Sequence, residues 1–99
     1  MAKHLITKVT GFDIVGDHVL RVRFDDLTSQ VINFLPVLGG DLFSPLRDKR
    51  VFAQVRLDSE CHTLVWPNGA DFDPATLHDW PKFAGALEMQ AKNWQLASA

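Results

Sequence analysis

The stretch HVLRVRF, residues 18–24, decides the fold class because apolar and polar side chains alternate along it. Leu20, Val22 and Phe24 fall on one side of an extended chain, and Arg21 and Arg23 fall on the other. This period of two is typical of an antiparallel strand with one face in the core and one face in water. The sequence therefore predicts a sheet that is solvated on one side.

Turn-forming residues flank this strand on both sides. A Gly-Asp pair precedes it at 16–17, and an Asp-Asp pair follows it at 25–26. The apolar runs 8–15 and 28–34 are therefore expected to pair with it as a three-stranded meander.

The middle of the chain predicts one short helix and a second hairpin. Ser44 and Pro45 offer an N-cap and a first-turn proline, which favours a short helix over 45–49. The runs 51–57 and 62–66 are rich in β-forming residues and are separated by polar residues, so they predict two further strands.

Two helices are expected after this hairpin. Asp73 and Pro74 repeat the pattern of a capping residue followed by proline, which favours a brief helix through Leu77. A longer helix is expected over 81–96, with an apolar stripe at helical spacing. The large members of that stripe are Trp80, Phe83, Leu87 and Trp94.

These elements predict one α+β domain over residues 1–99, with residues 1–5 disordered. We expect a mainly antiparallel sheet in the order β-β-β-α-β-β-α. The C-terminal helix should pack on the sheet or on a partner subunit.

One turn motif stands out between the last strand and the brief helix. It is the run WPNGADF at 66–72, in which Asn68-Gly69 suits positive φ and Trp66 should anchor the turn. The residues of this motif are Trp66, Pro67, Asn68, Gly69 and Asp71. Four other groups of residues accompany this motif: Leu20-x-Val22-x-Phe24, the segment Leu42-Phe43-x-Pro45-Leu46, Phe52 with Val55, and Pro74 with Leu77.

In this order, over residues 8–77, the chain resembles the bacterial domain-of-unknown-function family 2442. The resemblance implies a small prokaryotic α+β domain with no established activity, substrate or cofactor, so it assigns no catalytic residue. Some members carry a C-terminal helix-turn-helix, and some look as though they are encoded beside small toxins, which implies an antitoxin-like or regulatory role. Here the residues after Trp80 suffice for one helix only, and His78 stands where relatives place a tyrosine.

Composition narrows the partner class. The formal net charge of −2 provides no field that would collect nucleic acid, so we expect no specific DNA binding. The single Cys61 and the lack of a long apolar run predict a cytoplasmic protein with no membrane partner.

No spacing of ligands predicts a metal or an organic cofactor. Cys61 and His62 are adjacent, so on a strand they would point to opposite faces. Cys61 with His78 is the one conceivable nucleophile and base pair, and nothing local activates that thiol. Asp71 and Asp73 could act as paired carboxylates, but turn and cap roles suit both better.

We therefore predict a non-catalytic protein-interaction or regulatory module with an antitoxin-like role. Its expected partners are a second copy of the chain and a partner protein such as a small toxin. The dimer would form through the C-terminal helix, whose apolar stripe exceeds the need of one small sheet. The rival interpretation is that this helix covers its own core.

Two alternative functions stay open at this point. One is a small enzyme that uses Asp71 and His62, and the other is a weak RNA binder that uses Arg21, Arg23 and Arg56 on one solvated sheet face.

Overall fold

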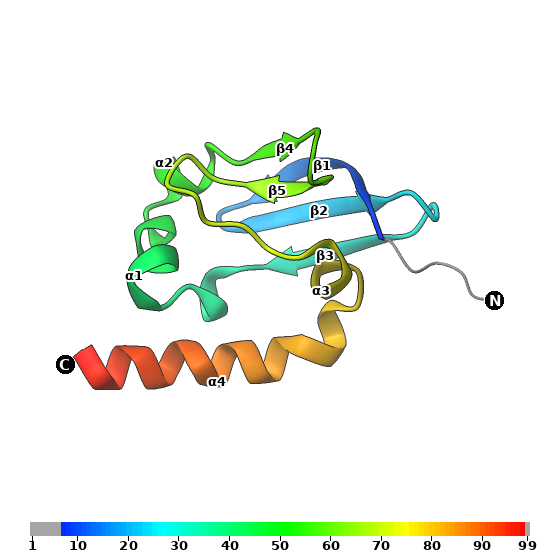
Figure 1. The fold of residues 1–99 in the computed structure, drawn as a ribbon. Helices are drawn as coiled ribbons and strands as arrows, with labels where there is room; N and C mark the ends of the chain where they lie inside the picture. Colours follow the sequence, from blue (N-terminus) through cyan, green and yellow to red (C-terminus); the bar gives the residue numbers. More distant parts are fainter. Residues whose placement is uncertain (1–6, 99) are drawn as a thin grey trace.

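The fold is an antiparallel meander joined to a small hairpin, with a long helix along one side (Figure 1). It is seen in a computed structural model that describes the backbone of residues 7–98 and the side chains of residues 7–93. The predicted disorder of residues 1–5 lies outside the described residues.

The meander consists of β1 (Val9–Gly16), β2 (Val19–Phe24) and β3 (Ser29–Asn33), paired antiparallel in the order β1-β2-β3. Its central strand alternates as predicted, because Leu20, Val22 and Phe24 are buried and the two arginines between them are exposed. The predicted three-stranded meander with one solvated face is therefore confirmed.

The segment between β3 and the second hairpin is more helical than its sequence predicts. It contains four short helical segments: η1 (Leu35–Val37), α1 (Gly40–Phe43), η2 (Ser44–Arg47) and α2 (Lys49–Phe52). The predicted helix over 45–49 thus falls on η2 and the start of α2. Ser44 is the first residue of η2 and not its N-cap, which is Phe43, whereas Asp48 caps α2 by accepting from the Arg50 N–H.

The predicted strand over 51–57 is wrong in its first half. Residues 51 and 52 belong to α2, and the strand β4 covers only Arg56–Asp58. Because the Asp48 cap starts a helical turn, the β-forming residue Phe52 is used as a buried helical residue instead. β4 pairs with β5 (Thr63–Val65) in a separate two-stranded sheet, so five strands form as expected but in two sheets.

Two helices complete the chain, α3 (Pro74–His78) and α4 (Trp80–Ser98). Asp73 caps α3 by accepting from the N–H groups of Ala75 and Thr76, as its position before proline predicts. The α+β class, the mainly antiparallel pairing and the C-terminal helix are confirmed.

An aromatic cluster joins the two halves of the core. The ring of Phe34, which directly follows β3, lies 5.6 Å from Phe52, 6.1 Å from Trp66, 5.3 Å from Phe72 and 5.4 Å from Trp80, measured between ring centroids. The cluster thus joins β3, α2, β5 and the start of α4. Its ring pairs are tilted or edge-to-face, which are the arrangements that aromatic pairs prefer.

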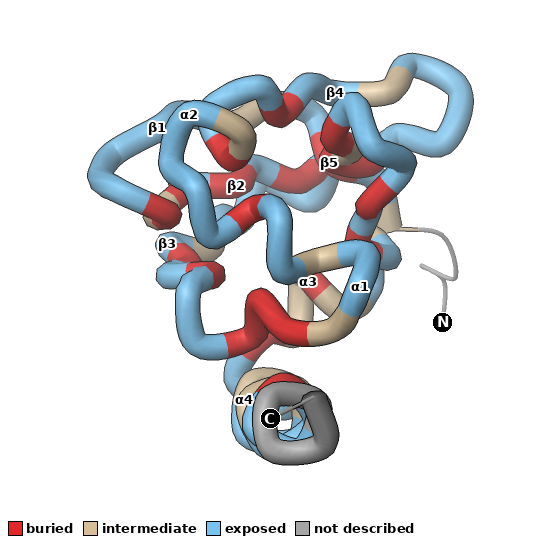
Figure 2. Tube along the Cα trace, turned by 90° about the vertical axis from the view of Figure 1, so that its left-hand side faces the viewer, coloured by how far each residue is buried: buried red, intermediate tan, exposed pale blue. Residues whose placement is uncertain are grey.

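The helix α4 reaches this core through Trp80, and its main contacts further along are with η1, α1 and α3. Figure 2 looks along α4, and most of the helix residues whose burial is described are exposed, with buried positions toward the body. At Ala91, which is buried, α4 passes close to Gly39. Among the described residues, no helix is long and apolar enough to cross a membrane.

Candidate functional site

The Trp66 motif builds a turn rather than a reactive centre. Trp66 is buried, and its Nε1 donates to the Phe52 carbonyl at 2.8 Å. The turn closes through the Trp66 N–H to the Ala70 carbonyl at 2.9 Å, with Gly69 at a φ of 91°. The Asn68 side chain ties the turn to α1 by donating to the Leu42 carbonyl at 2.8 Å. Pro67 and Asp71 are exposed, and Asp71 forms a single bridge to Val65.

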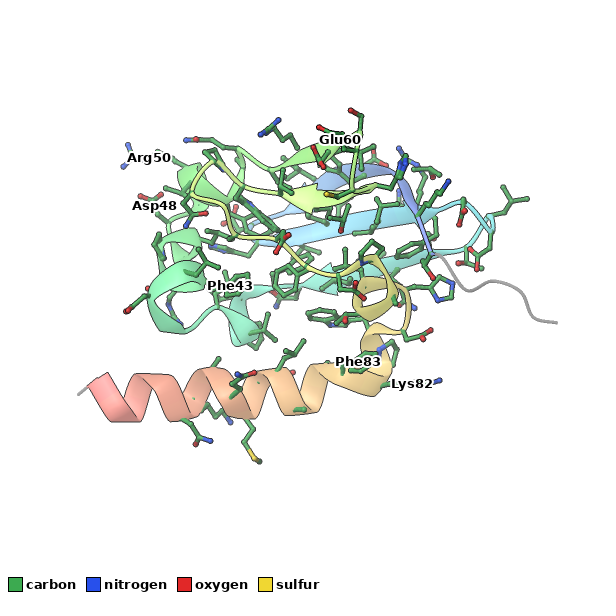
Figure 3. All side chains as sticks on the ribbon, in the orientation of Figure 1. Phe43, Asp48, Arg50, Glu60, Lys82 and Phe83 are labelled. Atoms are coloured by element: carbon green, nitrogen blue, oxygen red, sulfur yellow. The ribbon has the colours of Figure 1, made fainter. Side chains whose placement is uncertain are left out.

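The four residues predicted at an interface fall in different environments. Trp80 is buried in the aromatic cluster, and Leu87 is partly buried against the core. Phe83 is 41% exposed in the first turns of α4 (Figure 3). The backbone of Trp94 lies in α4, but its side chain lies outside the described residues.

Apolar side chains are exposed on α4 and on the segments that contact it. Phe83 and Met89 on α4 are 41% and 66% exposed, while Leu35 on η1 and Leu42 on α1 are 39% and 44% exposed. Both η1 and α1 pack against α4. We call the two exposed apolar residues of α4, Phe83 and Met89, the α4 surface.

A second cluster, which sequence analysis missed, lies where the β2–β3 turn meets the junction of α3 and α4. His78 Nδ1 is 2.9 Å from Asp79 Oδ1, and His78 Nε2 is 2.6 Å from Asp26 Oδ2. Thr28 supports Asp26, because its N–H and its hydroxyl both donate to Asp26 Oδ1. The Phe24 ring packs edge-on against the imidazole at 4.9 Å. Since 52 positions separate Asp26 from His78, only the fold brings these groups together.

These hydrogen bonds shift the ionisation of the cluster. The Asp79 carboxylate, followed by that of Asp26, raises the pKa of His78 above its ordinary 6.5. Hydrogen bonds from Thr28 and then from His78 lower the pKa of Asp26 to about 2. The cluster therefore favours an imidazolium between two carboxylates.

In its doubly protonated form, His78 cannot act as a general base. A general base needs a ring nitrogen with a free lone pair, and an imidazolium that donates from both nitrogens has none. In the β4–β5 hairpin, Asp58 opposes reactivity of Cys61, because its hydrogen bond with the thiol raises the pKa of Cys61. Among the described residues, no group of three His, Cys, Asp or Glu side chains could hold a metal ion.

The arginines proposed for RNA are divided between the two sheets. Arg21 and Arg23 share the exposed face of β2, but Arg56 lies on β4 in the other sheet, contrary to the predicted single face. Arg23 forms an ion pair with Asp13 on β1. A cross-strand ion pair therefore occupies part of this basic face.

The pair proposed for an enzyme also lies at the surface. His62 is exposed in the β4–β5 turn at a φ of 55°, and Asp71 is exposed at the end of the Trp66 motif. Among residues 7–93, the buried histidine is instead His18, whose Nε2 lies 2.9 Å from the Arg47 carbonyl and 3.1 Å from that of Leu46. Its position in a two-residue hairpin turn gave no sequence signal for this burial.

The fold and its surface clusters define a small α+β domain built on an antiparallel meander. The family model described as protein of unknown function (DUF2442) matches residues 9–83. Because this match covers more than half of the 99 residues, the chain belongs to that family, and the predicted resemblance is confirmed. No curated protein and no solved structure matches the chain significantly.

Proposed function

We propose that this chain is a non-catalytic protein-interaction module that binds through the α4 surface. The observation that carries the proposal is the exposure of Phe83 and Met89 on a helix that the body contacts on one side. Exposed apolar side chains on this helix favour a protein partner, because burying them away from water lowers the free energy.

The proposed partner is a second copy of the chain, related by a two-fold axis. A two-fold axis lets one patch meet its own copy, and such dimers are the commonest soluble oligomers. A small toxin, the partner class that the family resemblance implies, would compete for the same helix in an antitoxin-like role. The exposed Cys61 thiol suits a reducing, cytoplasmic setting.

Sedimentation velocity of the purified chain tests the dimer. We expect the wild type to sediment as a dimer at micromolar concentrations, and Phe83→Glu to sediment as a folded monomer. The matched control is Leu57→Glu, which changes an apolar residue 36% exposed on β4 and should leave the dimer intact. If Phe83→Glu does not fold, Met89→Glu replaces it, because that side chain is 66% exposed.

A wild-type monomer would overturn the dimer and leave the module to be tested with a different partner. Purification of tagged chain from its native cell then compares wild type with Phe83→Glu. A protein that is retained only by wild type, and that binds again when both are purified, supports the module. Equal retention by both chains would exclude the α4 surface as the binding site.

A further inference from the structure

We propose that Asp26, His78 and Asp79 form a proton-operated latch, which holds the α3–α4 junction against the β2–β3 turn while His78 is doubly protonated. In the latch, His78 meets the charged Asp26, which lies 52 positions away in the sequence, and its neighbour Asp79. It also lies where α4, the proposed interaction helix, begins.

Hydrogen-bond geometry carries the inference. The two His78 ring nitrogens lie 2.9 Å and 2.6 Å from two different carboxylates. An ionised carboxylate has no proton to donate and can only accept hydrogen bonds. Both ring nitrogens must therefore donate for both contacts to be favourable. A neutral imidazole has only one N–H. The lone pair of its unprotonated nitrogen would face the lone pairs of the second carboxylate, and this contact is repulsive. Loss of one proton therefore breaks one side of the latch.

Each side of the latch ties down a different element. Asp26 belongs to the β2–β3 turn, which its own hydrogen bonds to Thr28 already hold in shape. Asp79 ends α3 as its C-cap, and its carbonyl accepts from the Lys82 N–H in the first turn of α4. His78 thus joins the turn to the junction between the two helices.

The charged groups that face His78 are acidic. Asp26 approaches from the β2–β3 turn and Asp79 from the α3–α4 junction, while Phe24 contributes an apolar ring from β2. Lys82, the basic residue in the first turn of α4, extends outward at the end of the helix (Figure 3). With its side chain 27% exposed, His78 can exchange its proton with solvent.

Other contacts limit how far the latch opens. Gln30 on β3 donates to the His78 carbonyl at 2.8 Å, and Leu77 is fully buried. Neither contact depends on the charge of the ring, so α3 should stay in place after deprotonation. Deprotonation of His78 should therefore loosen only the β2–β3 turn and the first turn of α4.

Nuclear magnetic resonance of the wild-type histidine rings, with a parallel amide hydrogen-exchange series, tests the latch. We expect His78 to titrate above the ordinary 6.5 and the Lys82 amide to lose protection above that midpoint, after correction for intrinsic exchange. Asp26→Asn and Asp79→Asn should each lower the midpoint, whereas the remote control Glu60→Gln should not move it. In His78→Gln the protection of Lys82 should show no step with pH.

A His78 midpoint at or below 6.5 would refute the latch, and so would a midpoint that neither aspartate variant changes. Should His78→Gln fail to fold, the two asparagine variants still decide the question.

A regulatory role for the latch rests on the proposed function, so sedimentation of wild type below and above the midpoint is measured separately. We expect weaker association above it. Ring titration in a dilute monomer tests the latch even if no dimer forms.

Discussion

At the scale of single residues, three of the described residues other than glycine hold positive φ: His18, Leu27 and His62. Leu27 is the unusual member, because it is 95% exposed and has a φ of 72°. Its N–H donates to the Phe24 carbonyl at 3.1 Å, and the Phe24 N–H donates to the Thr28 carbonyl at 2.9 Å. This hairpin loop places a left-handed residue where glycine is favoured.

We therefore expect Leu27→Gly to stabilise the protein. Relief of the left-handed conformation is worth about 1–2 kcal/mol, and the added freedom of glycine in the unfolded chain costs about 0.5–1 kcal/mol. The net gain should be about 1 kcal/mol in urea unfolding. Leu57→Gly is the control, since its extended backbone gains no relief and should lose stability. A lower urea midpoint for Leu27→Gly would contradict this account.

Trp66 should be among the costliest residues to truncate. It is buried, it contacts the rings of Phe34, Phe52 and Phe72, and its indole donates to a main-chain carbonyl. Trp66→Ala should cost about 3–5 kcal/mol in chemical denaturation. Trp66→Phe keeps part of the packing and should cost less; equal losses in the two variants would assign the effect to the hydrogen bond alone.

At the scale of elements, the contact between Gly39 and α4 sets how closely the helix approaches the body. A Cβ on Gly39 would lie 2.8 Å from the Ala91 carbonyl oxygen and 2.9 Å from its Cα. The obstacle is backbone, which cannot turn aside as a flexible side chain can. Gly39 has an extended φ of −138°, so the requirement for glycine here comes from space and not from conformation.

We expect Gly39→Ala to destabilise the protein by about 1–3 kcal/mol, the usual cost of overpacking. Gly85→Ala is the matched control, because it stands inside α4 and a Cβ there would meet no atom within 4 Å apart from the local backbone of its own helix. That change should stabilise the helix by about 0.5–1 kcal/mol. Urea midpoints that move in the same direction for both variants would refute the close contact.

At the scale of the whole molecule, stability should depend on ionised carboxylates at acid pH. Hydrogen bonds lower the pKa of Asp26, chiefly from Thr28, of Asp48, chiefly from the Arg50 N–H, and of Asp58, chiefly from the Cys61 N–H. A carboxyl with a lowered folded pKa stabilises the fold above its ordinary pKa and loses that contribution as pH falls through the folded value. All three groups therefore act in the same direction.

We expect thermal stability to fall as pH drops from about 4 toward 2, the folded pKa of Asp26. In Asp26→Asn the melting temperature should start lower at neutral pH and fall less over this range. The stabilisation that His78 provides depends on pH in the opposite direction, because its pKa is raised in the folded state. This stabilisation is complete below the ordinary pKa of 6.5 and is lost as pH rises through the folded pKa. Melting temperatures measured over a series of buffers check both the acid and the alkaline change. A melting temperature that stays constant below pH 4 would contradict the predicted loss of stability in acid.

The sequence by itself determined the meander, the Asp73 cap, the start of the last helix and the family, because each depends on neighbours along the chain. Alternation, turn residues and caps act over a few positions, so they can be read without the fold. Only the tertiary structure decided that Phe52 is helical, that β4 and β5 form their own sheet, and that Trp80 joins the core. It alone brought His78 to Asp26 and Gly39 to Ala91, since packing of distant segments is encoded in no local pattern.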